Sequence, residues 1–68
     1  MKVRDIIKLL EADGWRLKAQ RGSHRQFVHP VKKGKATVAG KDNYEPPIGT
    51  AKSIFRQAGL PFPKKDTR

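Results

Sequence analysis

Apolar residues near the start of the chain recur with the period of an α-helix. Four of them stand at positions i, i+3, i+4 and i+7, so they share one helical face. They are Val3, Ile6, Ile7 and Leu10. Gly14 follows, and glycine readily adopts the left-handed conformation with which many helices end. This pattern predicts a helix over residues 3–13.

The period then changes from that of a helix to that of a strand. Trp15, Leu17 and Ala19 alternate with polar residues, which predicts a strand with one buried face. The segment 21–23 reads Arg-Gly-Ser and is a turn signal. A hairpin is therefore expected, with its returning strand beginning at residue 24.

Two more short strands and a second helix complete the pattern. The second strand is predicted over 24–29, where Phe27 is the large apolar residue, and the third over 35–39. A second helix is predicted over 48–58, with Gly59 placed to end it. Its apolar face comprises Ile48, Ala51, Ile54, Phe55 and Ala58.

The predicted order of elements is α-β-β-β-α, which defines an α+β fold. A three-stranded antiparallel sheet with both helices on one face buries every apolar stripe at once. The other face of the sheet then stays open to solvent. We expect a single domain over 1–60 and a flexible tail over 61–68, which reads "PFPKKDTR".

The register of the first hairpin decides which side chains reach the open face. A three-residue loop places Leu17 opposite Phe27, so that apolar residues meet on one face. The same loop places Gln20 opposite His24, and Lys18 opposite Gln26. The predicted open face then carries Arg16, Lys18, Gln20, His24 and Gln26, joined by Lys35 and Thr37 if Val38 is buried.

Charge narrows the class of partner. Sixteen Lys and Arg residues face six Asp and Glu residues, for a formal net charge of +10 on 68 residues. Such a chain attracts polyanions, which leaves RNA, DNA, an anionic membrane or an acidic protein as partners. The chain has no cysteine and no apolar run of about 18 residues that could span a membrane. We therefore expect a cytoplasmic protein without a membrane segment.

The two histidines are the candidates for proton transfer near neutral pH. The carboxylates are scattered over the first helix, a loop and the tail, so no metal site and no cofactor are expected. RNA carries its own nucleophile, the 2′-OH beside the scissile phosphate. One histidine with Arg or Lys therefore suits RNA cleavage better than DNA cleavage. The residue types and their spacing alone are as compatible with a binding or structural role for His24 as with a catalytic role.

Three stretches together resemble the HicA family of toxins. They are "IIKLLEADGW", "GSHRQFVHP" and "GTAKSIFRQAGL". The resemblance implies a fold like that of double-stranded-RNA-binding domains and an endoribonuclease activity on mRNA. It also implies His24 as the catalytic general acid/base and a HicB-like antitoxin, expected to be acidic, as the partner. Contact with DNA is expected only through that antitoxin.

The chain departs from the family where many members carry V-P-H-P after the third strand. Here the stretch reads "VAGKDNYEPP" and contains no histidine, so a role for a second histidine at that place does not carry over. We predict His29, Trp15 and Phe27 to be structural. The residues predicted to bind RNA are Arg16, Lys18, Arg21, Gly22, Ser23, Arg25 and Lys35.

The sequence is also compatible with two other functions. One is a non-catalytic RNA-binding module of the same fold. The other is a basic protein whose only partner is an acidic protein.

Overall fold

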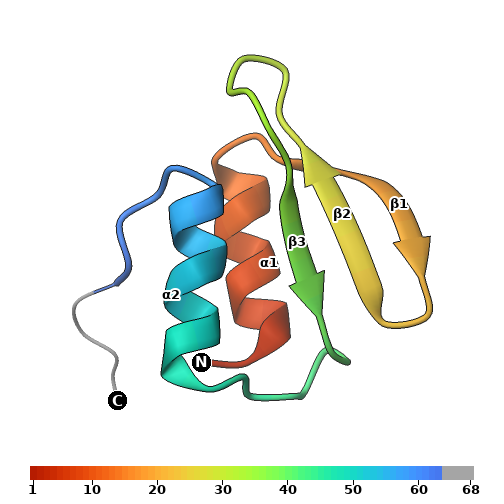
Figure 1. Ribbon diagram of the computed structural model, residues 1–68, viewed down its shortest axis with the longest axis vertical. Helices are drawn as coiled ribbons and strands as arrows, with labels where there is room; N and C mark the ends of the chain where they lie inside the picture. The colour runs from red at the N-terminus through yellow and green to blue at the C-terminus, as the bar shows by residue number, and fades with distance from the viewer. Residues whose placement is uncertain (64–68) are drawn as a thin grey trace.

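The computed structural model describes residues 1–63 and has the predicted order of elements. The elements are α1 (Val3–Ala12), β1 (Arg16–Arg21), β2 (His24–Val28), β3 (Ala36–Ala39) and α2 (Ile48–Gln57). The strands form one antiparallel sheet in the order β1-β2-β3. The two helices lie side by side, β3 is the strand nearest to them, and β1 is the outermost strand (Figure 1). The predicted α+β fold is therefore confirmed.

The core lies between the helices and the sheet. It is built from α1, α2, β2, β3 and the junction residue Trp15, whose side chain is fully buried. Phe27 is also buried, as its position on the apolar stripe predicts. The buried apolar residues are Val3, Ile6, Leu10, Trp15, Phe27, Ala36, Val38, Ala51, Ile54, Phe55 and Ala58.

Both helices end with the same backbone motif, with glycine in a left-handed conformation. Gly14 has φ 104° and Gly59 has φ 67°. The next residue closes each motif, because Trp15 N–H donates to the Leu10 carbonyl at 3.0 Å and Leu60 N–H donates to that of Phe55 at 2.9 Å. These are the hydrogen bonds of a Schellman motif. The motif at the end of α1 positions Trp15 so that its side chain packs in the core.

Substituting Gly14 by alanine is expected to lower the free energy of unfolding by about 2 kcal/mol or more. Positive φ alone costs a non-glycine residue about 1–2 kcal/mol, and a Cβ at this position would lie 2.9 Å from His29 Nε2. Gly34→Ala is the matched control, because Gly34 also has positive φ (87°) but nothing lies within 4 Å of its added Cβ. Urea denaturation of both variants gives the comparison. Equal losses would contradict a steric contribution from His29.

The first hairpin differs from the predicted register. Its turn has two residues, Gly22 and Ser23, and Arg21 pairs with His24. The three-residue loop was wrong, yet Leu17 does pair with Phe27 as predicted. A β-bulge between Leu17 and Ala19 reconciles the two facts, because its extra residue shifts the register by one position.

Three apolar residues predicted on buried faces are exposed, namely Leu17, Ala19 and Ile48. Ala19 pairs with Gln26, because the bulge turns it to the face away from the helices. Leu17 is 50% exposed and Ile48 is 64% exposed. Leu17 belongs to β1, which is the outermost strand and lies away from the helices (Figure 1). Ile48 is the first residue of α2, and the buried residues of this helix begin at Ala51.

The segment after α2 packs onto the core as far as it is described. The Phe62 ring meets that of Phe55 edge to face, with centroids 5.3 Å apart. Residues 64–68 of the predicted flexible tail lie outside the described residues. Within residues 1–63, no helix has both the length and the apolar character that crossing a membrane requires.

Candidate functional site

His24 is the first residue of β2, and its side chain is exposed. It stands in the middle strand of the sheet, paired with Arg21 on one side and Ala39 on the other. A hollow surrounds it, which we call the His24 hollow. Its lining residues are Ala19, Gln20, Arg21, His24 and Gln26. The imidazole therefore lies where a ligand on the sheet could contact it.

The alternation of side chains places His24 on the face away from the helices. Successive strand residues point to opposite faces, and Phe27 is buried against the helices. His24 and Gln26 consequently point outward, as predicted. The register adds the residues paired with the outward-facing positions of β2, namely Arg16, Ala19, Arg21, Thr37 and Ala39. We call this surface the open face.

The bulge changes the membership of the open face. Lys18 is the extra residue between the pairs of Leu17 and Ala19, so its predicted pairing with Gln26 was wrong. Gln20 pairs with Arg25 instead of His24, which assigns it to the helix side of the sheet. Arg21 takes the place beside His24 that the predicted register gave to Gln20.

The predicted RNA-binding residues do not form one cluster. Arg16 pairs with Val28, at the opposite end of β2 from His24. At about 3.3 Å per residue, that is roughly 13 Å along the strand. Lys35 directly precedes β3 and lies at the same far end. Arg21 therefore supplies the positive charge at one end of the open face, beside His24, and Arg16 and Lys35 supply it at the other end.

Arg25 points to the helix side, away from His24. Its Nη2 donates to Asp42 Oδ1 at 2.7 Å, and only 19% of its side chain is exposed. The Asp42 segment is itself fixed, because the Asp42 carbonyl accepts from Arg4 N–H at 3.0 Å and the Tyr44 carbonyl from Val3 N–H at 2.9 Å. Arg25 thus ties the hairpin to the loop that caps the first turn of α1.

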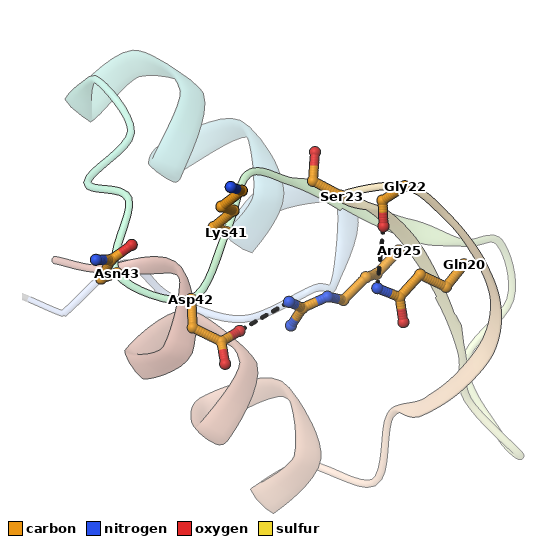
Figure 2. Close-up of a pocket in the computed structure, with 7 residues that line it drawn as sticks. All are labelled: Gln20, Gly22, Ser23, Arg25, Lys41, Asp42 and Asn43. Carbon is orange, nitrogen blue, oxygen red and sulfur yellow. Dashed lines mark hydrogen bonds and ion pairs between the residues drawn. The ribbon is translucent and has the colours of Figure 1, made fainter.

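The turn residues line a second pocket on this other side, which we call the hairpin pocket. Its lining residues are Gln20, Gly22, Ser23, Arg25, Lys41, Asp42 and Asn43 (Figure 2). The structure places Gly22 and Ser23 here and not among the residues that line the His24 hollow. Sequence reasoning missed Lys41, Asp42 and Asn43, because no periodic pattern places a loop residue next to a distant turn.

His29 has the contacts of a structural residue. Its Nδ1 accepts from the backbone N–H groups of Val31 and Lys32, both at 3.0 Å. Nε2 therefore carries the proton of the neutral ring and donates to the Asp13 carbonyl at 2.7 Å. The ring also meets that of Trp15 edge to face at 5.3 Å. With both nitrogens engaged, His29 joins the end of α1 to the loop after β2.

Lys32 extends this junction to α2. Its Nζ donates to Asp13 Oδ2 at 2.6 Å and to the Ala58 carbonyl at 3.1 Å. A cation near the last carbonyls of a helix is favourable. Lys32 is thus a structural cation.

The Lys32 ammonium lowers the pKa of the Asp13 carboxyl below its ordinary value by hydrogen bonding. A carboxyl whose pKa is lower in the folded state stabilises the fold above its unfolded pKa of 3.8. That contribution is lost as the pH falls through the folded-state value. Urea midpoints measured from pH 7 down to pH 3 should therefore fall less steeply for Asp13→Asn than for the wild type. Parallel curves would contradict this role of Asp13.

The strands contribute no negative charge to the site. The sequences of β1, β2 and β3 contain no Asp or Glu. Within residues 1–63, no three His, Cys, Asp or Glu side chains are grouped so that they could hold a metal ion. The open face therefore offers arginine side chains, amides and one imidazole, which are groups that bind anions and transfer a proton.

Comparison with known proteins gives the class and the family. The family model described as the HicA toxin of bacterial toxin–antitoxin systems matches residues 3–60. The chain therefore belongs to the HicA toxin family. It is a toxin of a toxin–antitoxin system, and its partner in that module is an antitoxin. No curated protein matches the chain.

Proposed function

We propose that this toxin is an endoribonuclease that cleaves mRNA without a metal ion, with His24 as general acid/base. The observation that carries the proposal is the placement of His24 beside Arg21 on an exposed face whose strands have no carboxylate. Membership of a toxin family supports it, because an RNA-cleaving enzyme stops growth when it is not restrained.

The proposed reaction follows from the chemistry of RNA. The 2′-oxygen attacks the adjacent phosphorus, the bond to the 5′-oxygen breaks, and a 2′,3′-cyclic phosphate forms. His24 either removes the 2′-OH proton or protonates the leaving 5′-oxygen, and water serves the other step. Arg21 stabilises the negative charge that gathers on the phosphate oxygens. Since the nucleophile belongs to the substrate, no metal-bound water is required.

The two charged ends of the open face define how the RNA lies. Arg21 stands at one end, and Arg16 and Lys35 at the other. A single strand that follows β2 can place one phosphate at each end. Backbone contacts of this kind give affinity without sequence preference.

RNA affinity is expected to fall steeply with salt. Each phosphate of a single strand that the protein neutralises contributes about −0.7 to the slope of log K against log salt. Arg21→Ala should reduce the magnitude of that slope by about 0.7, since one phosphate contact is lost. Lys8→Ala is the control, because Lys8 lies on α1 and its loss should leave the slope unchanged. Fluorescence anisotropy with the His24→Ala protein measures binding without cleavage.

We also propose that the antitoxin is a HicB-like protein that presents acidic side chains to the open face. The formal net charge of +10 supports an acidic partner, because complementary charge speeds association. Competition measures this directly. RNA and antitoxin should displace each other from the His24→Ala protein. Simultaneous binding of both would contradict a shared surface.

A non-catalytic RNA-binding module remains the second candidate function. The same positively charged face would bind RNA in that case. His24→Ala separates the two functions, because only the nuclease depends on proton transfer.

A further inference from the structure

The hairpin pocket and the His24 hollow lie on the two sides of one hairpin tip. Gln20 lines both of them, and Gly22 and Ser23 of the hairpin pocket stand in the chain between Arg21 and His24 of the His24 hollow. An RNA strand that follows β2 with its scissile phosphate at His24 continues past this tip with one of its flanking nucleotides. The chemistry of the hairpin pocket therefore bears on which nucleotide fits there.

The hairpin pocket offers hydrogen-bond donors and acceptors together. Gln20 Nε2 donates to the Gly22 carbonyl at 3.0 Å, which fixes the amide and leaves its oxygen as an acceptor. The side chains of Ser23 and Asn43 stand on either side of Lys41 in Figure 2, and each is both donor and acceptor. A nucleobase edge presents donors and acceptors side by side, and amide side chains match such edges.

Arg25 supplies a flat surface held in one orientation. Arg25 is one of the residues that line the pocket, and its guanidinium is held by Asp42 at 2.7 Å (Figure 2). Proteins that recognise single-stranded RNA stack bases on aromatic rings or on arginine planes. Asp42 is fixed to α1 by the hydrogen bond from Arg4 N–H to its carbonyl. The orientation of the Arg25 guanidinium is therefore already set in the protein without RNA.

The charges of the hairpin pocket favour a neutral base over an acidic peptide. Arg25 and Asp42 offset each other, and 66% of the Asp42 side chain is exposed. A carboxylate entering the pocket would meet that like charge. Lys41 is the other cation among the lining residues, and its ammonium can bind the phosphate of the nucleotide whose base lies in the pocket.

We propose that the hairpin pocket binds one nucleobase next to the cleaved bond and sets the sequence preference of the toxin. The base stacks on Arg25, and Asn43 and Gln20 read its edge. This inference rests on the proposed RNA cleavage, since it names what selects the cleavage site.

The test compares two variants from the same loop. The wild type, Asn43→Ala and Lys41→Ala each cleave a random-sequence RNA pool, and the new ends are sequenced. The wild type should prefer one base at a fixed position flanking the cut. Asn43→Ala should weaken that preference by roughly tenfold, the loss expected for one base-reading side chain. Lys41→Ala should slow cleavage at all sites and leave the preference intact, as expected for a phosphate contact.

The outcomes separate this inference from the proposed nuclease activity. The same pool is also selected by binding to the His24→Ala protein with and without Asn43→Ala, which reports base preference even if no chain is cut. Cleavage without any flanking preference, or a preference unchanged by Asn43→Ala, overturns the base pocket while the nuclease stands. A variant that loses antitoxin binding but keeps its preference would assign the pocket to the protein partner instead.

Discussion

Replacing His24 by alanine should slow RNA cleavage by about 10²–10⁴-fold, the usual contribution of a positioned general acid or base. The loss should fall on the chemical step, because His24 is one of several groups on the open face that can contact RNA. The fold should be little affected. His24 is exposed, and substitutions at exposed sites usually change stability by no more than about 0.5 kcal/mol.

His24→Asn sharpens this experiment. Asparagine keeps a hydrogen-bonding side chain but transfers no proton near neutral pH, so it should lose as much activity as alanine. Single-turnover rates on a defined RNA, with affinity measured on the same oligonucleotide, separate chemistry from binding. If His24→Asn cleaved at the wild-type rate, His24 would not be the general acid/base, and another group would have to transfer the proton. If the wild type itself cleaved no RNA, the non-catalytic module would become the better description.

Replacing Trp15 by alanine is expected to lower the free energy of unfolding by about 3–5 kcal/mol. The indole is fully buried, meets the His29 ring at 5.3 Å and follows the glycine that ends α1. A chain of this size has a total stability of roughly 3–10 kcal/mol. The variant should therefore be partly or wholly unfolded at 25 °C in water.

Leu17→Ala is the matched control for Trp15→Ala. The two residues stand on the same apolar stripe of the sequence, but Leu17 is 50% exposed. Its loss should cost about 1 kcal/mol, in proportion to the apolar area that it buries. Urea denaturation followed by circular dichroism measures both variants. If both variants lost the same free energy of unfolding, Leu17 would contribute as much to the core as Trp15, which would contradict its exposed position.

The fold was predictable because local signals agreed with one another. The helical stripe from Val3 to Leu10, the glycine ends at Gly14 and Gly59, and the alternation around Phe27 all favour the same arrangement. Both predicted helices and all three strands appear within one or two residues of their expected bounds. His24 on the open face also followed from the pairing of Leu17 with Phe27, which the structure contains.

The details of the site were less predictable because they depend on a bulge. Both a three-residue loop and a two-residue turn with a bulge keep Leu17 opposite Phe27. Only the two-residue turn with a bulge pairs Arg21 with His24 and Gln20 with Arg25. The apolar pattern cannot distinguish these cases, since it constrains the buried pair and not the polar residues beyond it.

Contacts between distant segments were not predictable from local patterns either. Arg25 was expected to bind RNA, but its partner is Asp42, 17 residues along the chain. Lys32 likewise meets Asp13 and the end of α2. In a chain with so many cations, only the structure identifies those already paired with carboxylates.

Analysis of the RNA ends formed in excess EDTA tests the proposed mechanism most directly. A short RNA with one cleavage site is digested by the purified toxin, and the fragments are identified by mass spectrometry. Attack by the 2′-oxygen predicts a 2′,3′-cyclic phosphate on one fragment and a 5′-hydroxyl on the other, with the rate unchanged by EDTA. Fragments ending in 3′-hydroxyl and 5′-phosphate, or cleavage abolished by EDTA, would contradict the His24 mechanism.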